Sequence, residues 1–433
     1  MLQVPPKTLS PVLMGAGEWI GDRPASAWRN FGHPTLRLHR RARATGYAAL
    51  VIRDKAAIVG IGHTEYVRAI GRSERETAHE ASRAALSDAG LDAYDVDGIF
   101  YVEGQSGQAA DLGRRLGVRN LRSWAAAGVG GGAACAPVVH AAMAIASGMC
   151  EVAIAYRARN RGTIGGRPWA KTSNLVSGQA AFESPHGFIS PVQMQAFMAR
   201  RYLYETRAAE ETFAHVSVAQ RRYAVQNPAA YFRDPITIDD VLESRMIADP
   251  LHLLECCPEN DGACAVVLTT AERARDCPHT PAWVSGVAQG VGPRHVPMTN
   301  FYNKSDPWDW PGAYAARDLY AMAGLGPEDV DVFQLYDMFA PVVVYGLEAY
   351  GFCKAGEGGD FVTDGNTETV NATIPTNTAG GSLSEAYIHG FNHILEGVRQ
   401  LRGTAANQVA GAEVSLIAAA PVVPTSAILL TKK

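Results

Sequence analysis

An internal repeat is the feature that most constrains the fold of this chain. The segment Ala81-Ser-Arg83…Ala89-Gly-Leu91…Asp95-Val-Asp97 has a counterpart with the same spacing, Ala315-Ala-Arg317…Ala323-Gly-Leu325…Asp329-Val-Asp331. In each copy a helix-periodic stretch ends at Ala-Gly, and an apolar strand pattern follows. Because strand and helix patterns alternate in both copies, we expect two similar α/β halves, each built on a mostly parallel sheet.

Further pairs of segments extend the repeat. The apolar run 56–61 resembles 283–288, and the helix and strand pattern of 138–155 resembles 392–417. The boundary falls between residues 271 and 281. We therefore place the first half at residues 54–275 and the second at 276–433.

Two regions do not follow the repeat. Residues 158–250 form a long insertion in the first half, with helical patterns at 191–205 and 208–226. Residues 1–53 have no sustained period and carry a basic run at 37–43. They lack the apolar core and small-residue cleavage site of a secretory signal, so we expect a poorly ordered N-terminal extension.

Composition excludes several classes of function. Of the 433 residues 47% are hydrophobic and 19% charged, which is typical of a globular protein. A net charge of −4 does not favour binding to nucleic acid or to a membrane surface. No run reaches the roughly 18 apolar residues of a membrane helix. Seven cysteines without a framework or zinc-site spacing indicate reduced thiols in the cytoplasm and no metal site.

Two glycine-rich turns are candidate ligand sites. Gly128-Val-Gly-Gly-Gly132 precedes a small-residue helix pattern, and its bare N–H groups could cradle an anion or a thioester oxygen. It lacks the spacing of nucleotide-binding motifs, and close helix packing is the alternative. In the stretch 377–390, Gly380-Gly381 would let the backbone approach a ligand closely.

Two tyrosines lie where chemistry is favoured. Tyr387 comes near the expected start of a helix, where free N–H groups favour developing negative charge. A phenol, whose pKa is normally about 10, could become a usable base there. Tyr336 and Asp337 follow the apolar strand pattern 331–335, and the carboxyl ends of parallel strands often carry active sites. For each tyrosine the alternative is a structural hydrogen bond.

Taken together, these motifs resemble the thiolase superfamily from about residue 54 to the end. More narrowly, the chain is similar to the lipid-transfer-protein branch, related to the thiolase domain of sterol carrier protein X. That family implies a five-layered αβαβα fold and a homodimer. The residues that carry the resemblance are Gly60-Ile-Gly-His-Thr-Glu65, Asn227-Pro228, Asp234-Pro-Ile-Thr237, Asp240-Val-Leu242, Arg245-Met-Ile247, Pro250-Leu251, Cys256-Cys-Pro258, Asp261-Gly-Ala263, Tyr350-Gly-Phe-Cys353 and Asn377-Thr-Ala-Gly-Gly381.

The chain departs from thiolases at the catalytic positions. Spacing places Gly131 where thiolases keep the nucleophilic cysteine, with Cys135 one turn further on. Tyr336 replaces the Asn of the Asn-Glu-Ala-Phe motif, and Tyr387 replaces the His of Gly-His-Pro. The second thiolase cysteine is absent from 416–422. Claisen chemistry needs a thiolate to accept the acyl group, so we do not expect that reaction.

This pattern is similar to the thiolase-like aldolases of steroid side-chain degradation. Those enzymes work with a small OB-fold and zinc-ribbon partner, which implies a heterotetramer here. The resemblance implies retro-aldol cleavage of a β-hydroxyacyl-CoA thioester into a ketone and a short acyl-CoA, such as propionyl-CoA. No bound cofactor is expected, because CoA arrives as part of the substrate.

Retro-aldol cleavage needs a base, an acid and an oxyanion hole, but no nucleophile. We expect Tyr336 and Tyr387 to form the acid–base pair. Backbone N–H groups near Gly131, Gly380 and Gly381 would hold the thioester oxygen. Asp337 would orient Tyr336 or cap the following helix. His389 would support the catalytic residues without contacting the substrate, or would be structural.

Two other functions remain open. One is a thiolase acting on a branched or aromatic acyl-CoA with Cys135 recruited, although that thiol is expected one helical turn too deep. The other is a catalytically silent lipid carrier or scaffold. Tyrosines at both vacated catalytic positions argue against simple decay of an active site.

Overall fold

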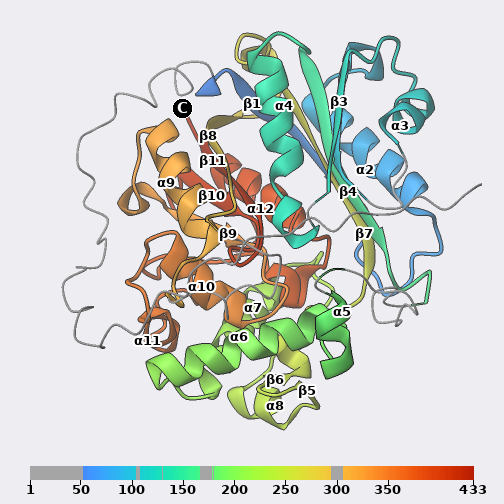
Figure 1. Cartoon of the computed structure of the whole chain (residues 1–433). Coiled ribbons are helices and arrows are strands. Elements are labelled where there is room, and N and C mark those ends of the chain that lie inside the picture. The colour runs from blue at the N-terminus through green and yellow to red at the C-terminus, as the bar shows by residue number, and fades with distance from the viewer. Residues whose placement is uncertain (1–51, 104–107, 129, 166–177, 179, 294–305) are drawn as a thin grey trace, which may run out of the picture. The chain divides into compact units, whose positions relative to one another are not determined.

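The computed structural model of the chain describes residues 52–103, 108–128, 130–165, 178, 180–293 and 306–433 (Figure 1). The expected N-terminal extension therefore lies outside the described residues, except for its last two positions. The boundaries proposed for the two halves and the insertion stay predictions.

The first half supplies five strands and three helices to the body of the fold. The strands are β1 (Ala56–His63), β2 (Gly98–Val102), β3 (Ser123–Ala127), β4 (Val152–Asn160) and β7 (Asp261–Thr270). The helices are α2 (Glu74–Ala89), α3 (Ala109–Leu116) and α4 (Ala136–Ala146).

The second half repeats this scheme. Its strands are β8 (Ala282–Gly290), β9 (Val332–Leu335), β10 (Val414–Ala418) and β11 (Thr425–Thr431). Its helices are α9 (Pro311–Ala323), α10 (Pro341–Ala349), α11 (Gly358–Thr363) and α12 (Asn392–Arg402).

The repeat read from the sequence has a structural basis. α2 and α9 each end at a glycine in the left-handed region, Gly90 at φ 66° and Gly324 at φ 68°. Only glycine adopts that conformation without a steric cost, which explains the shared Ala-Gly-Leu motif. A short 3₁₀ turn and a buried strand, β2 or β9, follow each helix.

The strands run in the order β3-β2-β4-β7-β1-β8-β11-β10-β9. The two halves join through β1 and β8, which pair only at Ala57 with Trp283 and Ile58 with Ala282. The expectation of mostly parallel sheets is wrong. β2 pairs in parallel with β3 and β4, and β9 with β10, but β7 and β11 run antiparallel to their neighbours. β11 follows β10 after a short turn, a connection that leaves no room for a crossover helix.

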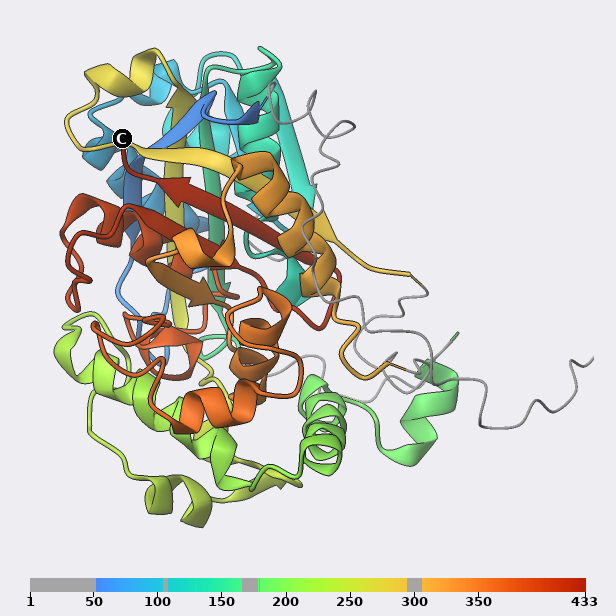
Figure 2. The same cartoon turned by 90° about the vertical axis from the view of Figure 1, so that its left-hand side faces the viewer.

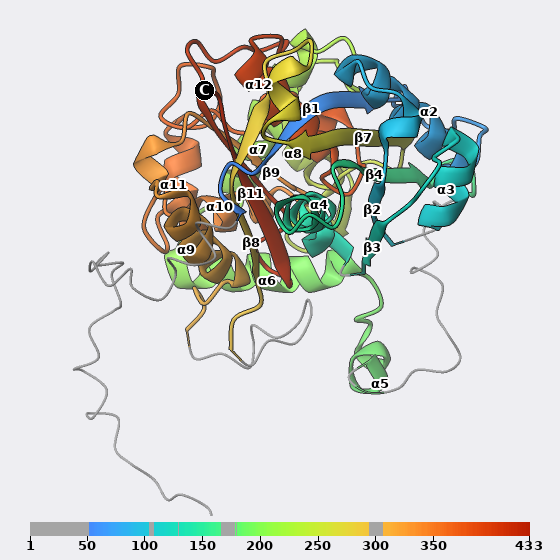
Figure 3. The same ribbon diagram turned by 90° about the horizontal axis from the view of Figure 1, so that it is seen from above.

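Two helices form the central layer between the halves. α4 and α12 each contact strands of both halves, and Figure 3 shows α4 viewed nearly along its axis among them. One apolar core joins these helices to both sets of strands. A second core lies under α2 and α3, and a third under α9 and α10. This arrangement is the expected five-layered αβαβα fold.

The insertion between β4 and β7 is mainly helical, and α6 (Pro191–Thr206), α7 (Glu211–Gln226) and α8 (Ile238–Glu243) lie together at one end of the sheets (Figure 2). α7 packs on α10, α11 and residues 381–385 of the second half. No helix in the described part of the chain has both the length and the apolarity needed to cross a membrane. The elements of the insertion are α5 (Ala180–Glu183), α6 (Pro191–Thr206), α7 (Glu211–Gln226), α8 (Ile238–Glu243), β5 (Met246–Ala248) and β6 (Leu251–His252).

Among the described residues, five glutamates are buried: Glu74, Glu255, Glu348, Glu385 and Glu396. Burial raises the pKa of Glu255, Glu348 and Glu385 to about 7 in each case. Glu255 is fully buried, and its Oε2 accepts a hydrogen bond of 2.7 Å from the His252 N–H. A carboxyl whose pKa rises on folding stabilises the folded state while it is protonated. That contribution is complete below the unfolded pKa of about 4.5 and is lost as the pH rises through about 7.

Glu255→Gln should therefore flatten the dependence of stability on pH. Between pH 5 and pH 8 the wild-type chain should lose on the order of 3 kcal/mol more unfolding free energy than the variant, because glutamine has no proton to release. Denaturant unfolding at the two pH values measures this difference. Glu243→Gln, which changes an exposed carboxyl, is the control. Parallel pH profiles for wild type and Glu255→Gln would contradict the explanation.

Candidate active site

Tyr336 lies directly after β9, at the edge of the second half. Its N–H donates to the Ala418 carbonyl at 2.9 Å, so the parallel β9–β10 pairing fixes its backbone. The side chain is 2% exposed. Two glycines make room for the phenol. A Cβ on Gly131 would lie 2.8 Å from Tyr336 Cε1, and one on Gly390 would lie 2.5 Å from Tyr336 Cβ.

The turn that begins at Asn377 is aligned on the same strand. The Asn377 N–H donates to the Phe333 carbonyl at 2.9 Å. Its side chain accepts from the Leu335 N–H at 2.7 Å and donates to the Leu335 carbonyl at 3.0 Å. Asn377 has φ 56°, a conformation that asparagine tolerates better than most residues. The amide therefore extends the sheet by one pairing and sets the start of the turn beside Tyr336.

Asp337 connects the two loops. Its fully buried carboxylate accepts from the N–H groups of Ser382 at 2.7 Å and Leu383 at 3.2 Å. The Nε2 of His393 lies 3.0 Å from Oδ1, the oxygen that also accepts from Ser382. Asp337 therefore holds the turn 381–385, and it does not cap α10, whose first turn has no side-chain cap.

Gly380 and Gly381 pack against protein atoms at their Cβ positions. A Cβ on Gly380 would lie 2.6 Å from the Ala224 Cβ of α7. One on Gly381 would collide with Asp337 Oδ2 and Gln220 Oε1. Both glycines also have positive φ, 108° and 63°. Their conformation thus follows from close packing, and their expected share in an oxyanion hole stays a prediction.

Tyr387 was expected near the start of a helix, and it lies before the first turn of α12 and not within it. α12 starts at Asn392, and the chain turns sharply before it at His389 with φ 58° and Gly390 with φ 82°. The Tyr387 N–H donates to Asn260 Oδ1 at 2.7 Å. A helix dipole therefore does not act on this phenol directly, and its electrostatic surroundings come from side chains.

The structure brings the two tyrosines together. Their rings are nearly parallel, at 18°, with centroids 6.4 Å apart. Tyr387 is 5% exposed. Burial raises the pKa of Tyr336 well above its ordinary value, and nearby Tyr387, Cys257 and the hydrogen bond between the two phenols add to the rise. Tyr336 is therefore held in its protonated form in the unliganded protein.

Two arginines of β4 border this pair, and the sequence reasoning missed both. Arg159 Nη2 donates to the Tyr387 hydroxyl at 3.4 Å, and its Cζ lies 5.3 Å from the Tyr387 ring centroid. Arg157 Nη2 lies 3.3 Å from His389 Nδ1. The available signal was their alternation, Arg157-Ala-Arg159, at the end of an otherwise apolar strand. Charged residues are almost never buried without partners, so such a pair marks a polar site.

The glycine-rich turn before α4 has two structural roles. Gly131 faces the Tyr336 ring, whereas a Cβ on Gly132 would collide with the Pro424 carbonyl. Cys135 occupies the N-cap position of α4, after a 3₁₀ turn at Gly130–Ala133. It is fully buried, its thiol lies 3.6 Å from the Ile417 carbonyl, and burial raises the pKa of the thiol. Whether the Gly131 N–H holds an oxygen stays a prediction.

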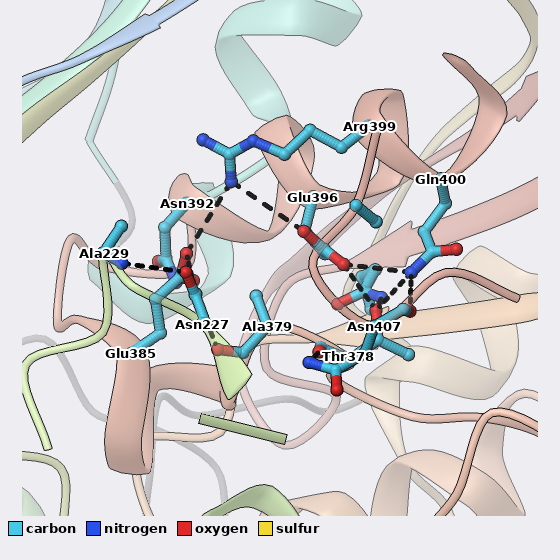
Figure 4. Close-up of polar contacts among 12 residues, drawn as sticks. Asn227, Ala229, Thr378, Ala379, Glu385, Asn392, Glu396, Arg399, Gln400 and Asn407 are labelled. Carbon is cyan, nitrogen blue, oxygen red and sulfur yellow. Dashed lines mark hydrogen bonds and ion pairs between the residues drawn. The ribbon is translucent and has the colours of Figure 1, made fainter. Parts of the chain in front are cut away.

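A buried polar network holds the segment that leads to Tyr387 in place (Figure 4). Asn392 Nδ2 donates to Glu385 Oε2 at 2.8 Å, and Asn227 Nδ2 donates to the Ala379 carbonyl at 3.0 Å. Arg399 Nη1 lies 3.8 Å from carboxylate oxygens of both Glu385 and Glu396. These contacts tie the turn to α12 on one side and to the end of α7 on the other.

Comparison with known proteins identifies relatives over most of the chain. A family model described as thiolase C-terminal domain-like matches residues 296–430. The chain is 44% identical over 388 residues to a 17-hydroxy-3-oxo-4-pregnene-20-carboxyl-CoA lyase of Mycobacterium tuberculosis, covering 88% of this chain and all of that one. It is 43% identical to a steroid side-chain-cleaving aldolase of Thermomonospora curvata, with 88% and 98% coverage. An acetyl-CoA acetyltransferase of Methanothermobacter thermautotrophicus is 32% identical, with 83% and 94% coverage.

Solved structures agree. A structure described as Ltp2-ChsH2(DUF35) aldolase superposes with a TM-score of 0.83 at 42% identity, covering 88% of this chain and 99% of that one. Human mitochondrial 3-ketoacyl-CoA thiolase superposes with a TM-score of 0.63 at 16% identity, covering 88% and 100%, which reports on the fold alone. The chain belongs to the thiolase-like family.

Proposed function

We infer that this protein is a thiolase-like aldolase that cleaves a carbon–carbon bond of a β-hydroxyacyl-CoA thioester. The observation that carries the inference is the meeting of Tyr336 and Tyr387, from two separate loops, in one buried cluster beside Arg159. Relatives at 43–44% identity, described as steroid side-chain-cleaving enzymes, place the chain in the same reaction class.

The reaction needs two proton transfers and no covalent intermediate. One member of the pair, in its phenolate form, takes the proton of the tertiary hydroxyl group. The bond between the hydroxyl carbon and the carbon next to the thioester then breaks, giving a ketone and a thioester enolate. A proton returned to the enolate carbon by the other phenol completes the acyl-CoA product. Because the two phenols are neighbours, a proton can pass from one to the other and restore the starting protonation state after each cycle.

Arg159 suits this chemistry because negative charge develops during the reaction. When Tyr387 carries more negative charge, the guanidinium already hydrogen-bonded to its hydroxyl stabilises that state without rearranging. The high pKa of Tyr336 keeps that phenol a proton donor until substrate binds. The pair is thus electrostatically unequal, as acid–base partners with different roles require.

We propose a steroid side-chain CoA thioester as the substrate, by similarity to the lyase of Mycobacterium tuberculosis, with propionyl-CoA as the short product. By similarity to the solved Ltp2-ChsH2(DUF35) aldolase, we propose that the chain works with a partner that carries a DUF35 domain. A homodimer of this chain would form the centre of that assembly. Activity with and without the co-encoded partner tests whether the partner is required.

Tyr336→Phe and Tyr387→Phe should each lower turnover by roughly 10²-fold or more, which is the usual scale for general acid–base catalysis. Each substitution removes a hydroxyl group and keeps the ring that packs in the site, so the fold should survive. Turnover of 17-hydroxy-3-oxo-4-pregnene-20-carboxyl-CoA by the complex with its partner is the measurement, with circular dichroism as the check on folding. Tyr94→Phe, at an exposed tyrosine, is the matched control. Full activity in both site variants would refute the assignment.

A thiolase activity remains the second candidate, because an acetyl-CoA acetyltransferase is 32% identical. It would require Cys135 to act as a thiolate. Since this thiol is fully buried and its pKa is raised, we expect Cys135→Ala to leave carbon–carbon cleavage unchanged. Intact mass after incubation with acyl-CoA should show no acylated wild-type chain. An acylated Cys135, together with an inactive Cys135→Ala variant, would establish the thiolase instead.

A further inference from the structure

Arg157 makes an unusual set of contacts for a strand residue. It is 1% exposed, and its Nη1 donates to the carbonyls of Val102 at 2.7 Å and Glu103 at 2.6 Å. These bonds fix the plane of the guanidinium. Its Nη2 then lies 3.3 Å from Nδ1 of His389, on the loop that carries Tyr387.

This contact determines which nitrogen of His389 carries a proton. A guanidinium has five N–H donors and no acceptor. His389 Nδ1 must therefore accept the hydrogen bond, so it carries no proton. In the neutral ring the proton is then on Nε2, which is left as a donor.

The surroundings keep this imidazole neutral. Burial lowers the pKa of His389 well below its ordinary value, and the positive charges of Arg159, Arg157 and Arg161 lower it further. The acidic neighbours Glu74 and Glu259 act on the arginines of this row. A second proton on His389 would thus meet three guanidinium groups, and the ring stays uncharged at neutral pH.

His389 lies beside both phenols. Its ring stands edge-on to both phenols, with centroids 5.8 Å from Tyr336 and 5.4 Å from Tyr387. Both tyrosines are almost fully buried, whereas His389 is partly exposed. Among the residues that the structure describes, Arg157 hydrogen-bonds the ring, at Nδ1.

We propose that His389 is a third catalytic residue, whose Nε2–H donates a hydrogen bond to the thioester oxygen as the enolate forms, and that Arg157 is the positioning residue that fixes this tautomer. The proposal rests on the proposed aldolase function. The phenol pair moves both protons of the reaction, and His389 keeps its own. A neutral imidazole suits this role, because it stabilises an oxyanion without releasing a proton to it.

The first test compares substitutions at His389 in the complex of the full chain with its partner. His389→Ala should lower kcat by about 10²–10³-fold, the usual loss for an oxyanion donor, with a smaller change in KM. His389→Gln, which keeps an N–H donor, should recover part of the loss. His279→Ala, at a histidine on the surface near Asp88, is the control and should keep wild-type turnover. Wild-type kcat in His389→Ala would overturn the proposal.

The second test reads the tautomer directly and does not depend on turnover. In ¹⁵N-histidine-labelled protein, the resonances lost in His389→Ala assign the ring. We expect a neutral ring protonated at Nε2 from pH 6 to pH 8 in the wild type. Arg157→Met should release the ring to exchange between tautomers or to titrate, and Arg157→Lys should restore part of the wild-type behaviour. A ring protonated at Nδ1, or charged at pH 7, would overturn the proposal.

The two tests separate this proposal from the proposed function. If wild-type complex cleaves the steroid thioester while His389→Ala is fully active, the aldolase stands and the third donor is refuted. If the wild type does not cleave the thioester but the His389 ring is protonated only at Nε2, the aldolase function and the catalytic role of His389 are both refuted. The hydrogen bond between Arg157 and His389 is then structural.

Discussion

The carboxylate of Asp337 is the contact on which the site depends. Tyr336 and Tyr387 come from loops about 50 residues apart in sequence, and no strand pairing joins the phenols themselves. Asp337 follows Tyr336 directly and binds two N–H groups of the turn that leads to Tyr387. His393, from α12, also contacts this carboxylate, at the oxygen that binds Ser382. A short polar bridge thus sets the spacing of the two rings, and the packing of α12 holds the bridge in place.

The contacts of Asp337 also explain why glycines occur in the loop that carries Tyr387. A carboxylate can approach the N–H groups of residues 382 and 383 only if the preceding residues carry no side chain, since a Cβ on Gly381 would collide with Asp337. Gly390 is likewise needed for close packing, because a Cβ there would collide with Tyr336. Sequence reasoning read Gly380 and Gly381 as space for a ligand. Their Cβ positions lie against Ala224, Asp337 and Gln220.

Local sequence patterns predicted much of the fold. The features that they did not predict depend on packing between distant segments. The Ala-Gly-Leu motifs after residues 89 and 323 predicted two equivalent helix ends because a left-handed glycine is a local requirement. Strand direction is not local. An apolar segment such as 261–270 has the same pattern in either orientation, so the antiparallel β7 was missed. The position of Tyr387 was misjudged for a related reason, since the turn at His389 and Gly390 separates it from the helical period that follows.

Sequence reasoning predicted the candidate residues that stand at catalytic positions of the family. It missed those that stand elsewhere. Tyr336 and Tyr387 stand in motifs that can be aligned by eye, whereas Arg157 and Arg159 belong to a strand with no such motif. Their burial costs free energy, because each guanidinium must leave water. Carbonyl contacts to Arg157 and the phenol beside Arg159 offset part of that cost.

The guanidinium groups of Arg157 and Arg159 face the loop that carries Tyr387 and His389. The thiolase position of the nucleophilic cysteine corresponds here to Gly131, which lies in the 3₁₀ turn before α4 and has no thiol. Positive charge lies on β4 instead, beside the phenols, where the proposed retro-aldol reaction would form an alkoxide and then an enolate. The missing cysteine and the arginines beside the phenols are separate observations, and both fit that reaction.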